Sequence, residues 1–272
     1  MRVAVVGHVE WIEFARVEHV PRPGEIVHVL ERWEEVGGGG AVAAVQLARL
    51  AGECMFLTAL GDDDIGHRSA RQLAELGVRV EPAWRDEPQR RAFVHLDGNG
   101  ERTITVIGER LGPHGADPLP WEALTQCDAV YFTAGDAAAL EAARSARTLV
   151  ATMRARDALH AGVQVDALVA SAVDAGETYS DGDVEPPPRT VVRTEGASGG
   201  SVLVGGEVER WQPAELPGPV VDAYGAGDCF AAGLTFALAN GLAPIDAARV
   251  GAECGAACMT RRGPYGAHGG PA

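Results

Sequence analysis

The chain has 272 residues, of which 46% are hydrophobic and 22% are charged, a composition typical of an ordinary protein with a buried core. A formal net charge of −15 argues against a nucleic-acid partner, because such partners bind a basic face. No apolar run reaches the roughly 18 residues of a membrane span, and the first residues do not resemble a signal peptide. We therefore expect a cytoplasmic protein with no membrane partner.

All 23 basic residues are arginine, because the sequence contains no lysine. This excludes mechanisms that depend on a lysine, such as the phosphate-binding lysine of a P-loop or a Schiff base. If the protein handles phosphate, then backbone amides, arginine and metal ions must bind it. The five cysteines include no C-x-x-C pair, and we expect them to be reduced and mostly buried.

In the first half of the chain, apolar strands alternate with helices. The predicted strands cover 2–8, 54–61 and 78–84, and the predicted helices cover 40–52 and 64–77. Residues 91–107 contain two alternating runs separated by Gly-Asn-Gly, which is the pattern of a hairpin. The loop at 112–126, with its prolines and glycines, is expected to include a short helix.

The second half alternates more regularly. Strands are predicted at 128–134, 147–152, 165–171 and 189–196, a hairpin at 201–211, and helical segments near 136–146, 154–160, 174–180, 225–240 and 244–260. Such alternation predicts an α/β fold with a mainly parallel central sheet and helices on both of its faces. The segments 25–36 and 91–107 alternate more openly and are expected to form a small separate sheet.

The stretch V-V-D-A-Y-G-A-G-D at 220–228 joins a strand end to a helix through a glycine-rich turn. Unpaired amides and the helix dipole favour an anion at such a helix start, and Gly225 and Gly227 let the backbone approach it. A carboxylate there, Asp228, suits phosphoryl transfer to an alcohol, because it can take the hydroxyl proton while the amides hold the phosphoryl charge. The alternative is that Asp228 only caps the helix.

Five motifs in family order resemble those of the ribokinase-like (PfkB-type) carbohydrate kinases, and the resemblance covers nearly the whole chain. D-A-Y-G-A-G-D-C-F-A-A-G at 222–233 resembles their D-T-x-G-A-G-D-x-F-x-x-G signature, and the glycine run at 37–40 with its following helix resembles their first signature. The other similar segments are V-A-V-V-G-H near the start with G-D-D-D-I-G at 61–66, T-E-G-A-S-G-G at 194–200, and A-A-C-M-T-R-R-G-P-Y-G-A at 256–267.

The resemblance implies one ribokinase-like domain over residues 1–264, with a small β lid from about 13–35 and 91–107 and a flexible tail at 265–272. It implies transfer of the γ-phosphate of ATP to a hydroxyl of a sugar or sugar-like small molecule. Mg²⁺ is the implied cofactor, together with a monovalent cation such as K⁺ in some members of the family. A homodimer through the lid is expected on the same analogy.

The resemblance also implies roles for individual residues. Asp228 would be the general base, and the amides of Gly225, Ala226 and Gly227 would form the anion hole. The remaining expected contacts are Thr194, Gly196, Gly199 and Ser171 with the nucleotide, Glu10, Gly38, Gly39 and Asp222 with the acceptor, and Asp174 and Glu177 with Mg²⁺ through water.

The departures from the family pattern lie mostly on the acceptor side. The family's N-x-D reads E-W-I at 10–12, so Ile12 replaces an aspartate and either Glu10 or Glu13 stands in for it. Val42 replaces an asparagine, and an apolar side chain cannot bridge two hydroxyls as an amide does.

The family's N-x-x-E motif reads either Ser171-x-x-Asp174 or Asp174-x-x-Glu177, and the spacing from Asp166 favours the first register. A catalytically weak or inactive binding protein of the same fold is the alternative function, motivated by the altered acceptor residues and opposed by the intact G-A-G-D. A dinucleotide oxidoreductase is disfavoured, because no G-x-G-x-x-G follows the first strand.

Overall fold

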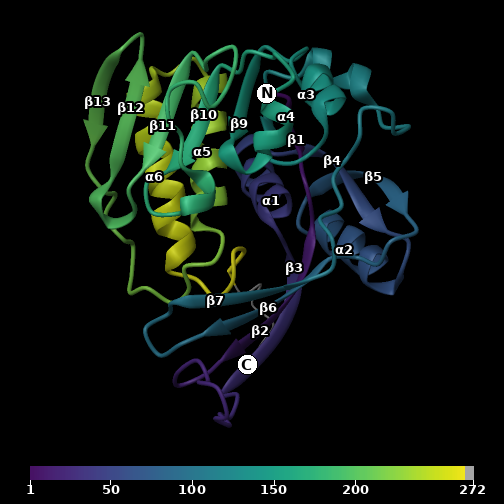
Figure 1. Cartoon of the computed structure of the whole chain (residues 1–272), viewed down its shortest axis with the longest axis vertical. Coiled ribbons are helices and arrows are strands. Elements are labelled where there is room, and N and C mark those ends of the chain that lie inside the picture. Colours follow the sequence, from purple (N-terminus) through teal and green to yellow (C-terminus); the bar gives the residue numbers. More distant parts are fainter. Residues whose placement is uncertain (267–272) are drawn as a thin grey trace.

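The computed structural model describes residues 1–266 and contains a large sheet, helices on both faces of that sheet, and a smaller sheet beside it (Figure 1). Within these residues the large sheet has nine strands in the order β13-β12-β11-β10-β9-β8-β1-β4-β5. Their bounds are β1 Val3–Val6, β4 Cys54–Gly61, β5 Val78–Arg85, β8 Ala129–Phe132, β9 Thr148–Thr152, β10 Ala167–Ser171, β11 Thr190–Thr194, β12 Gly200–Val204 and β13 Glu207–Trp211. Only the β11–β12 and β12–β13 pairs are antiparallel in this sheet, so the predicted mainly parallel sheet is confirmed.

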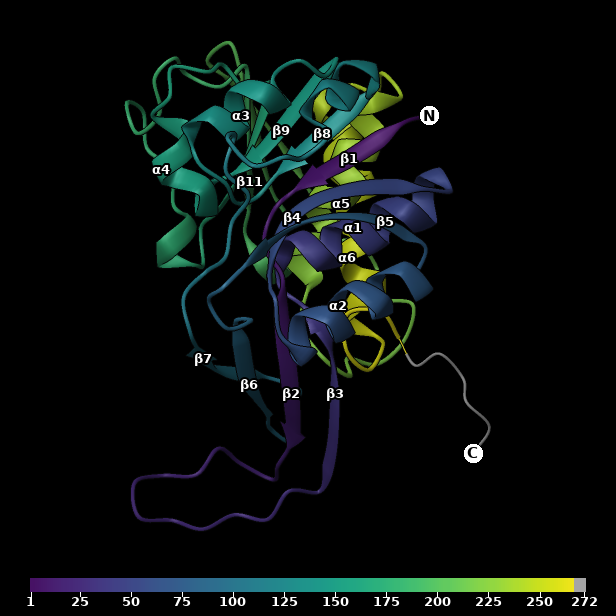
Figure 2. The same cartoon turned by 90° about the vertical axis from the view of Figure 1, so that its right-hand side faces the viewer.

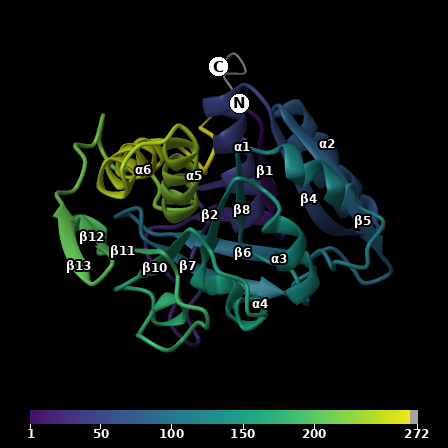
Figure 3. The same ribbon diagram turned by 90° about the horizontal axis from the view of Figure 1, so that it is seen from above.

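Helices cover the large sheet on both faces, because its central strands are apolar on both sides. All eight residues of β4 are buried, for example. On one face lie α1 Gly39–Ala51, α2 Asp64–Glu75, α5 Ala226–Ala239 and α6 Pro244–Met259, and on the other lie α3 Ala137–Ala143 and α4 Arg156–Leu159 (Figure 3). Short 3-10 helices occupy Trp121–Gln126, Met153–Ala155, Ala175–Glu177 and Gly196–Ser198.

The smaller sheet forms the lid, and its strand order is β3-β2-β6-β7. Its strands are β2 Glu10–Arg16, β3 Glu31–Gly37, β6 Arg91–Leu96 and β7 Arg102–Ile107. Strands β6 and β7 lie within the predicted segment 91–107, and β3 overlaps the second half of the predicted segment 25–36. Strand β2 lies outside 25–36 and begins before the expected lid segment of about 13–35, and residues 25–30 form no strand. Residues 17–30 instead make a long loop that extends away from the rest of the molecule (Figure 2). The alternating residues of this loop have no neighbouring strand with which to pair.

The end of the chain differs from the expected flexible tail at 265–272. Tyr265 is 5% exposed and belongs to the main apolar core, and its carbonyl accepts a hydrogen bond from Arg49 at 2.7 Å. Tyr265, the first residue of the expected tail, is therefore packed in the core through its aromatic side chain. The rest of the predicted tail, 267–272, lies outside the described residues.

All five cysteines are free, and four of them are buried. No helix in residues 1–266 combines the length and the apolar character needed to cross a membrane.

Candidate active site

The turn before α5 is held by Asp222. This carboxylate is fully buried, and it accepts hydrogen bonds from the amide of Tyr224 at 2.8 Å and the amide of Gly263 at 3.0 Å. Burial raises the pKa of Asp222, and the two amide hydrogen bonds oppose that rise. Because both of its carboxylate oxygens accept hydrogen bonds from backbone amides, Asp222 stabilises the conformation of the turn.

The first turn of α5 is open to a ligand. Gly225 has φ +80°, and a Cβ there would lie 2.9 Å from Pro264 and 3.1 Å from Val42, so only glycine fits. A Cβ at Gly227, by contrast, would meet no atom within 4 Å. The space beside Gly227 at the start of this 14-residue helix is therefore free, and a helix start with free space beside it is suited to binding an anion.

Asp228 lies where the starts of α5 and α1 meet. Its Oδ1 would be 2.8 Å from a Cβ on Gly39, so the carboxylate packs directly on the backbone of that glycine. Burial raises the pKa of Asp228, and the positive charges of Arg154 and Arg102 lower it. The structure thus brings the predicted base to the predicted acceptor glycines.

Gly38 is fixed beside the same point by Tyr224. The Gly38 amide donates a hydrogen bond to the Tyr224 hydroxyl at 3.0 Å, and the Tyr224 ring meets the Phe14 ring edge-on with centroids 5.3 Å apart. Gly38 has φ +86°, and a Cβ there would lie 2.9 Å from the amide nitrogen of Glu10. The lid strand β2 and the glycine run are therefore in close contact.

Glu10 is buried at the start of β2, and Arg90 neutralises its charge. Arg90 Nε donates to Glu10 Oε1 at 2.6 Å, and His8 Nε2 lies 3.8 Å from the same oxygen. Glu13, the other candidate for the missing aspartate, pairs with Arg91 and Arg32. Both glutamates are thus already paired with arginine.

Two buried polar atoms near Glu10 and Gly39 lack a partner within residues 1–266, namely His8 Nδ1 and Thr133 Oγ1. Burial and the positive charges of Arg110, Arg90 and Arg154 lower the pKa of His8 well below its usual value, so the imidazole is neutral. Thr133 Oγ1 would lie 3.4 Å from a Cβ on Gly39, close to the Asp228 carboxylate. Buried polar groups normally find partners, so these atoms point to a bound polar molecule.

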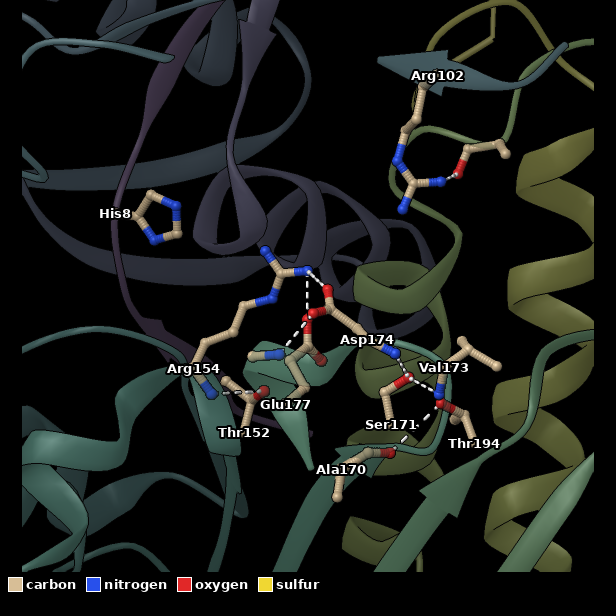
Figure 4. Close-up of polar contacts among 12 residues, drawn as sticks. His8, Arg102, Thr152, Arg154, Ala170, Ser171, Val173, Asp174, Glu177 and Thr194 are labelled. Carbon is tan, nitrogen blue, oxygen red and sulfur yellow. Dashed lines mark hydrogen bonds and ion pairs between the residues drawn. The ribbon is translucent and has the colours of Figure 1, made fainter. Parts of the chain in front are cut away.

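The acids predicted to bind Mg²⁺ converge on Arg154, which follows β9. Its guanidinium pairs with Glu177 and lies 3.7 Å from Asp174 Oδ2 (Figure 4). Burial raises the pKa of Glu177, and Arg154 opposes that rise. The Ser171 hydroxyl accepts hydrogen bonds from the amides of Val173 and Asp174, so Ser171 shapes the loop that carries Asp174.

These acids fit a hydrated Mg²⁺ better than a directly coordinated one. Carboxylate oxygens are ligands that Mg²⁺ prefers, and the ion usually keeps several waters. Within the described part of the chain, however, no group of three or more His, Cys, Asp or Glu side chains is placed to hold a metal ion. Asp174 and Glu177 therefore suit water-mediated binding, in which the ion shares them with Arg154.

The expected nucleotide residues lie on and after β11, beside β10. The Thr194 hydroxyl donates to the Ala170 carbonyl at 3.3 Å, which ties β11 to β10. Gly196 has φ +58° and open space around it, whereas a Cβ on Gly199 would lie 2.2 Å from the Trp211 carbonyl oxygen. Gly199 thus serves close packing, and the open side of this turn is at Gly196.

Sequence reasoning did not identify three residues of the site, namely Arg154, Thr133 and Arg102. Thr133 directly follows β8, and Arg154 lies two residues after the end of β9. Their positions at the carboxyl ends of parallel strands could have identified both as candidate site residues. Arg102 comes from the lid strand β7 and donates to the Ala223 carbonyl at 3.1 Å, next to the glycine turn (Figure 4). No local pattern indicates this contact.

Known proteins resemble the chain along most of its length. The family model described as pfkB family carbohydrate kinase matches residues 1–182 and 184–268. A fructokinase of Klebsiella pneumoniae is 27% identical over 267 residues, covering 84% of this chain and 86% of the fructokinase. A ribokinase of Dictyostelium discoideum is 31% identical over 108 residues, which are 39% of this chain and 34% of that protein.

A solved structure has the same fold. Arabidopsis thaliana ribokinase complexed with ribose and ATP superimposes with a TM-score of 0.75 at 21% identity, covering 97% of this chain and 94% of that one. The predicted ribokinase-like fold is thereby confirmed, and the family match confirms the predicted class of enzyme. The chain belongs to the pfkB family of carbohydrate kinases.

Proposed function

We propose that the chain transfers the γ-phosphate of ATP to a hydroxyl of a sugar or sugar-like small molecule, with Asp228 as general base. The observation that carries the proposal is the position of the Asp228 carboxylate, at the start of α5 and against Gly39 at the start of α1. A carboxylate beside two helix starts suits the transfer of an anionic group to an alcohol. The similar fructokinase and ribokinases support this class of reaction.

Asp228 would accept the proton of the attacking hydroxyl. Its raised pKa makes it a stronger base than an exposed aspartate, while Arg154 and Arg102 favour the ionised form that the reaction requires. The amides of Gly225, Ala226 and Gly227 would hold the charge of the phosphoryl group as it moves. Because this helix start is already open and fixed by Asp222, little reorganisation is needed.

The ATP phosphates would lie between this anion hole and the turn at Gly196, which has open space around it. Asp174 and Glu177 would hold a hydrated Mg²⁺ there, and a bound Mg²⁺ would neutralise phosphate charge. Arg154 pairs with both acids, so it is placed to exchange one carboxylate for phosphate when the nucleotide binds.

The acceptor would bind between the lid and the glycine run. Gly38 and Gly39 allow its close approach, and the orphaned His8 Nδ1 and Thr133 Oγ1 can hydrogen-bond its hydroxyls. Closure of the lid would exclude water, which competes with the acceptor for the phosphoryl group.

A homodimer through the lid is supported by strand β7. This strand lies at the edge of the small sheet, and all six of its residues are exposed, including Ile104, Val106 and Ile107. An exposed apolar edge strand tends to pair with another chain. We propose a second copy of the lid as the partner.

The test is acceptor-dependent turnover by the purified chain. ATP and Mg²⁺ are supplied with a panel of sugars, sugar acids, sugar phosphates, nucleosides and polyols, and the formation of ADP and of a phosphorylated acceptor is measured. We expect stoichiometric phosphorylation of at least one acceptor. If a panel member binds tightly but is never phosphorylated, the chain is a binding protein and the proposal is wrong.

A further inference from the structure

A cavity of about 220 Å³ opens at the carboxyl ends of β8 and β9, next to the proposed acceptor site. Thr133, directly after β8, lies near Gly39 and the Asp228 carboxylate, and the next residue, Ala134, lines the cavity. Arg154 also lines the cavity while its charge acts on Asp228. Arg154 is thus common to the wall of the cavity and to the electrostatic surroundings of Asp228.

The basic side chains lining the cavity are Arg110, His114 and Arg154, and the acidic ones are Asp136 and Asp157. Asp136 is engaged by backbone, since its Oδ1 accepts from the amides of Ala139 at 2.8 Å and Gly115 at 2.9 Å. Asp157 lies on α4 and attracts Arg110 electrostatically, although no ion pair within 4 Å joins the two among the described residues.

Arg110 differs from the other arginines near His8. Arg90 is paired with Glu10, and Arg154 is paired with Glu177 and Asp174. Among the ion pairs within residues 1–266, none includes Arg110, whose guanidinium makes a single long hydrogen bond of 3.4 Å to the Arg154 carbonyl. Most of its five N–H donors thus remain available at the cavity wall.

The surroundings of Arg110 are unfavourable for a lone cation. Partial desolvation of the guanidinium lowers the pKa of Arg110, and repulsion by Arg90 and Arg154 lowers it further, against weaker attraction from Glu10 and Asp157. The residue as a whole stays open to solvent, so a ligand can reach it. A bound anion would relieve the repulsion and fill the free donors.

We propose that the phosphate acceptor carries an anionic group, a phosphate or a carboxylate, in addition to the hydroxyl that is phosphorylated, and that Arg110 binds this group in the cavity. The proposal rests on the proposed kinase function and names the substrate class of that same site. Arg154 and His114 would flank the anion, while His8 and Thr133 would contact the neutral hydroxyls between it and Asp228. A neutral sugar would leave the positive charge of Arg110 without an anionic partner.

The experiment uses the full chain and matched acceptors, namely neutral pentoses and hexoses, their monophosphates and the corresponding aldonic acids. Wild type is compared with Arg110→Gln, Arg110→Lys and the control Arg249→Gln, an exposed residue paired with Asp246 on α6. We expect an anionic acceptor to have the highest kcat/KM. Arg110→Gln should raise its KM roughly 10- to 100-fold, as expected for a lost charge-assisted contact, with the KM for ATP unchanged. Arg110→Lys should retain part of the affinity, and the control should equal wild type.

Calorimetric binding of the same acceptors separates the two possible failures. If a neutral sugar is the best acceptor, or if Arg110→Gln weakens neutral and anionic acceptors equally, the inference is overturned while the kinase function stands. If no acceptor is phosphorylated, the proposed kinase function is wrong. In that case the binding of anions decides the inference: stronger binding by wild type than by Arg110→Gln supports the role of Arg110, and equal binding overturns it. Preference for monophosphates over aldonic acids identifies the anion as phosphate, and the reverse identifies it as carboxylate.

Discussion

Glu35 on the lid strand β3 is predicted to make the folded protein less stable as the pH rises from about 4.5 to about 7. Burial raises the pKa of Glu35 from 4.5 to about 7, and the nearby charge of Asp222 adds to the rise. The indole N–H of Trp33, 3.1 Å from Glu35 Oε1, and the charge of Arg262 oppose it. Between these two pH values only the unfolded chain releases the proton, so ionisation favours unfolding.

The size of the effect follows from the shift. At about 1.4 kcal/mol per pKa unit, the shift from 4.5 to about 7 corresponds to at most about 3.5 kcal/mol of unfolding free energy. The stabilisation is fully present below pH 4.5, is lost as the pH rises through 7, and changes no further above that.

Urea unfolding from pH 5 to pH 8 measures this effect when wild type is compared with Glu35→Gln, which stays neutral. The two proteins should have similar stability near pH 5, and the variant should be about 2–3 kcal/mol more stable at pH 8. Glu209→Gln, at an exposed position on β13, is the matched control and should follow wild type. A difference between Glu35→Gln and wild type that is constant across this pH range would refute the reasoning.

Three further predictions concern the proposed catalytic turn and the lid. Gly39→Ala places a Cβ 2.8 Å from Asp228 Oδ1, so steady-state assays should show kcat reduced roughly 10- to 100-fold while circular dichroism shows an intact fold. Arg154→Gln removes a charge that lowers the pKa of Asp228, so the acidic limb of the kcat/KM profile should move to higher pH; an unmoved limb contradicts this assignment. Light scattering should find a dimer in wild type and a monomer in Val106→Asp, which places a charge on the exposed face of β7, and equal masses would contradict the lid interface.

The fold could be predicted from the sequence because its signals are local. The strand predicted from the apolar run at 54–61 has the same bounds as β4. The glycine turn before Asp228 correctly indicates the start of α5. Apolar and polar residues alternate at 25–30 as they do in a strand, yet these residues form a loop. A strand also needs a neighbouring strand to pair with, and the alternation does not indicate whether one is present.

The candidate site could be predicted only in part, because its side chains meet across the fold. The motif around Asp228 located the glycine turn at the start of α5, but the pairing of Arg154 with Asp174 and Glu177 joins segments about 20 residues apart. Asp222 was expected to contact the acceptor, whereas both of its oxygens bind backbone amides. The orphaned atoms of His8 and Thr133 become apparent only when burial and hydrogen bonds are known.

The role of Asp228 as the base in phosphoryl transfer is tested most directly by Asp228→Asn, a variant of nearly the same size. With the acceptor found in the panel, the account predicts that kcat falls by about three or more orders of magnitude, since the proton acceptor is lost. The nucleotide Kd from calorimetry should stay within about twofold of wild type, because the amides that bind phosphate remain. Turnover equal to wild type in Asp228→Asn would contradict the assignment of the base.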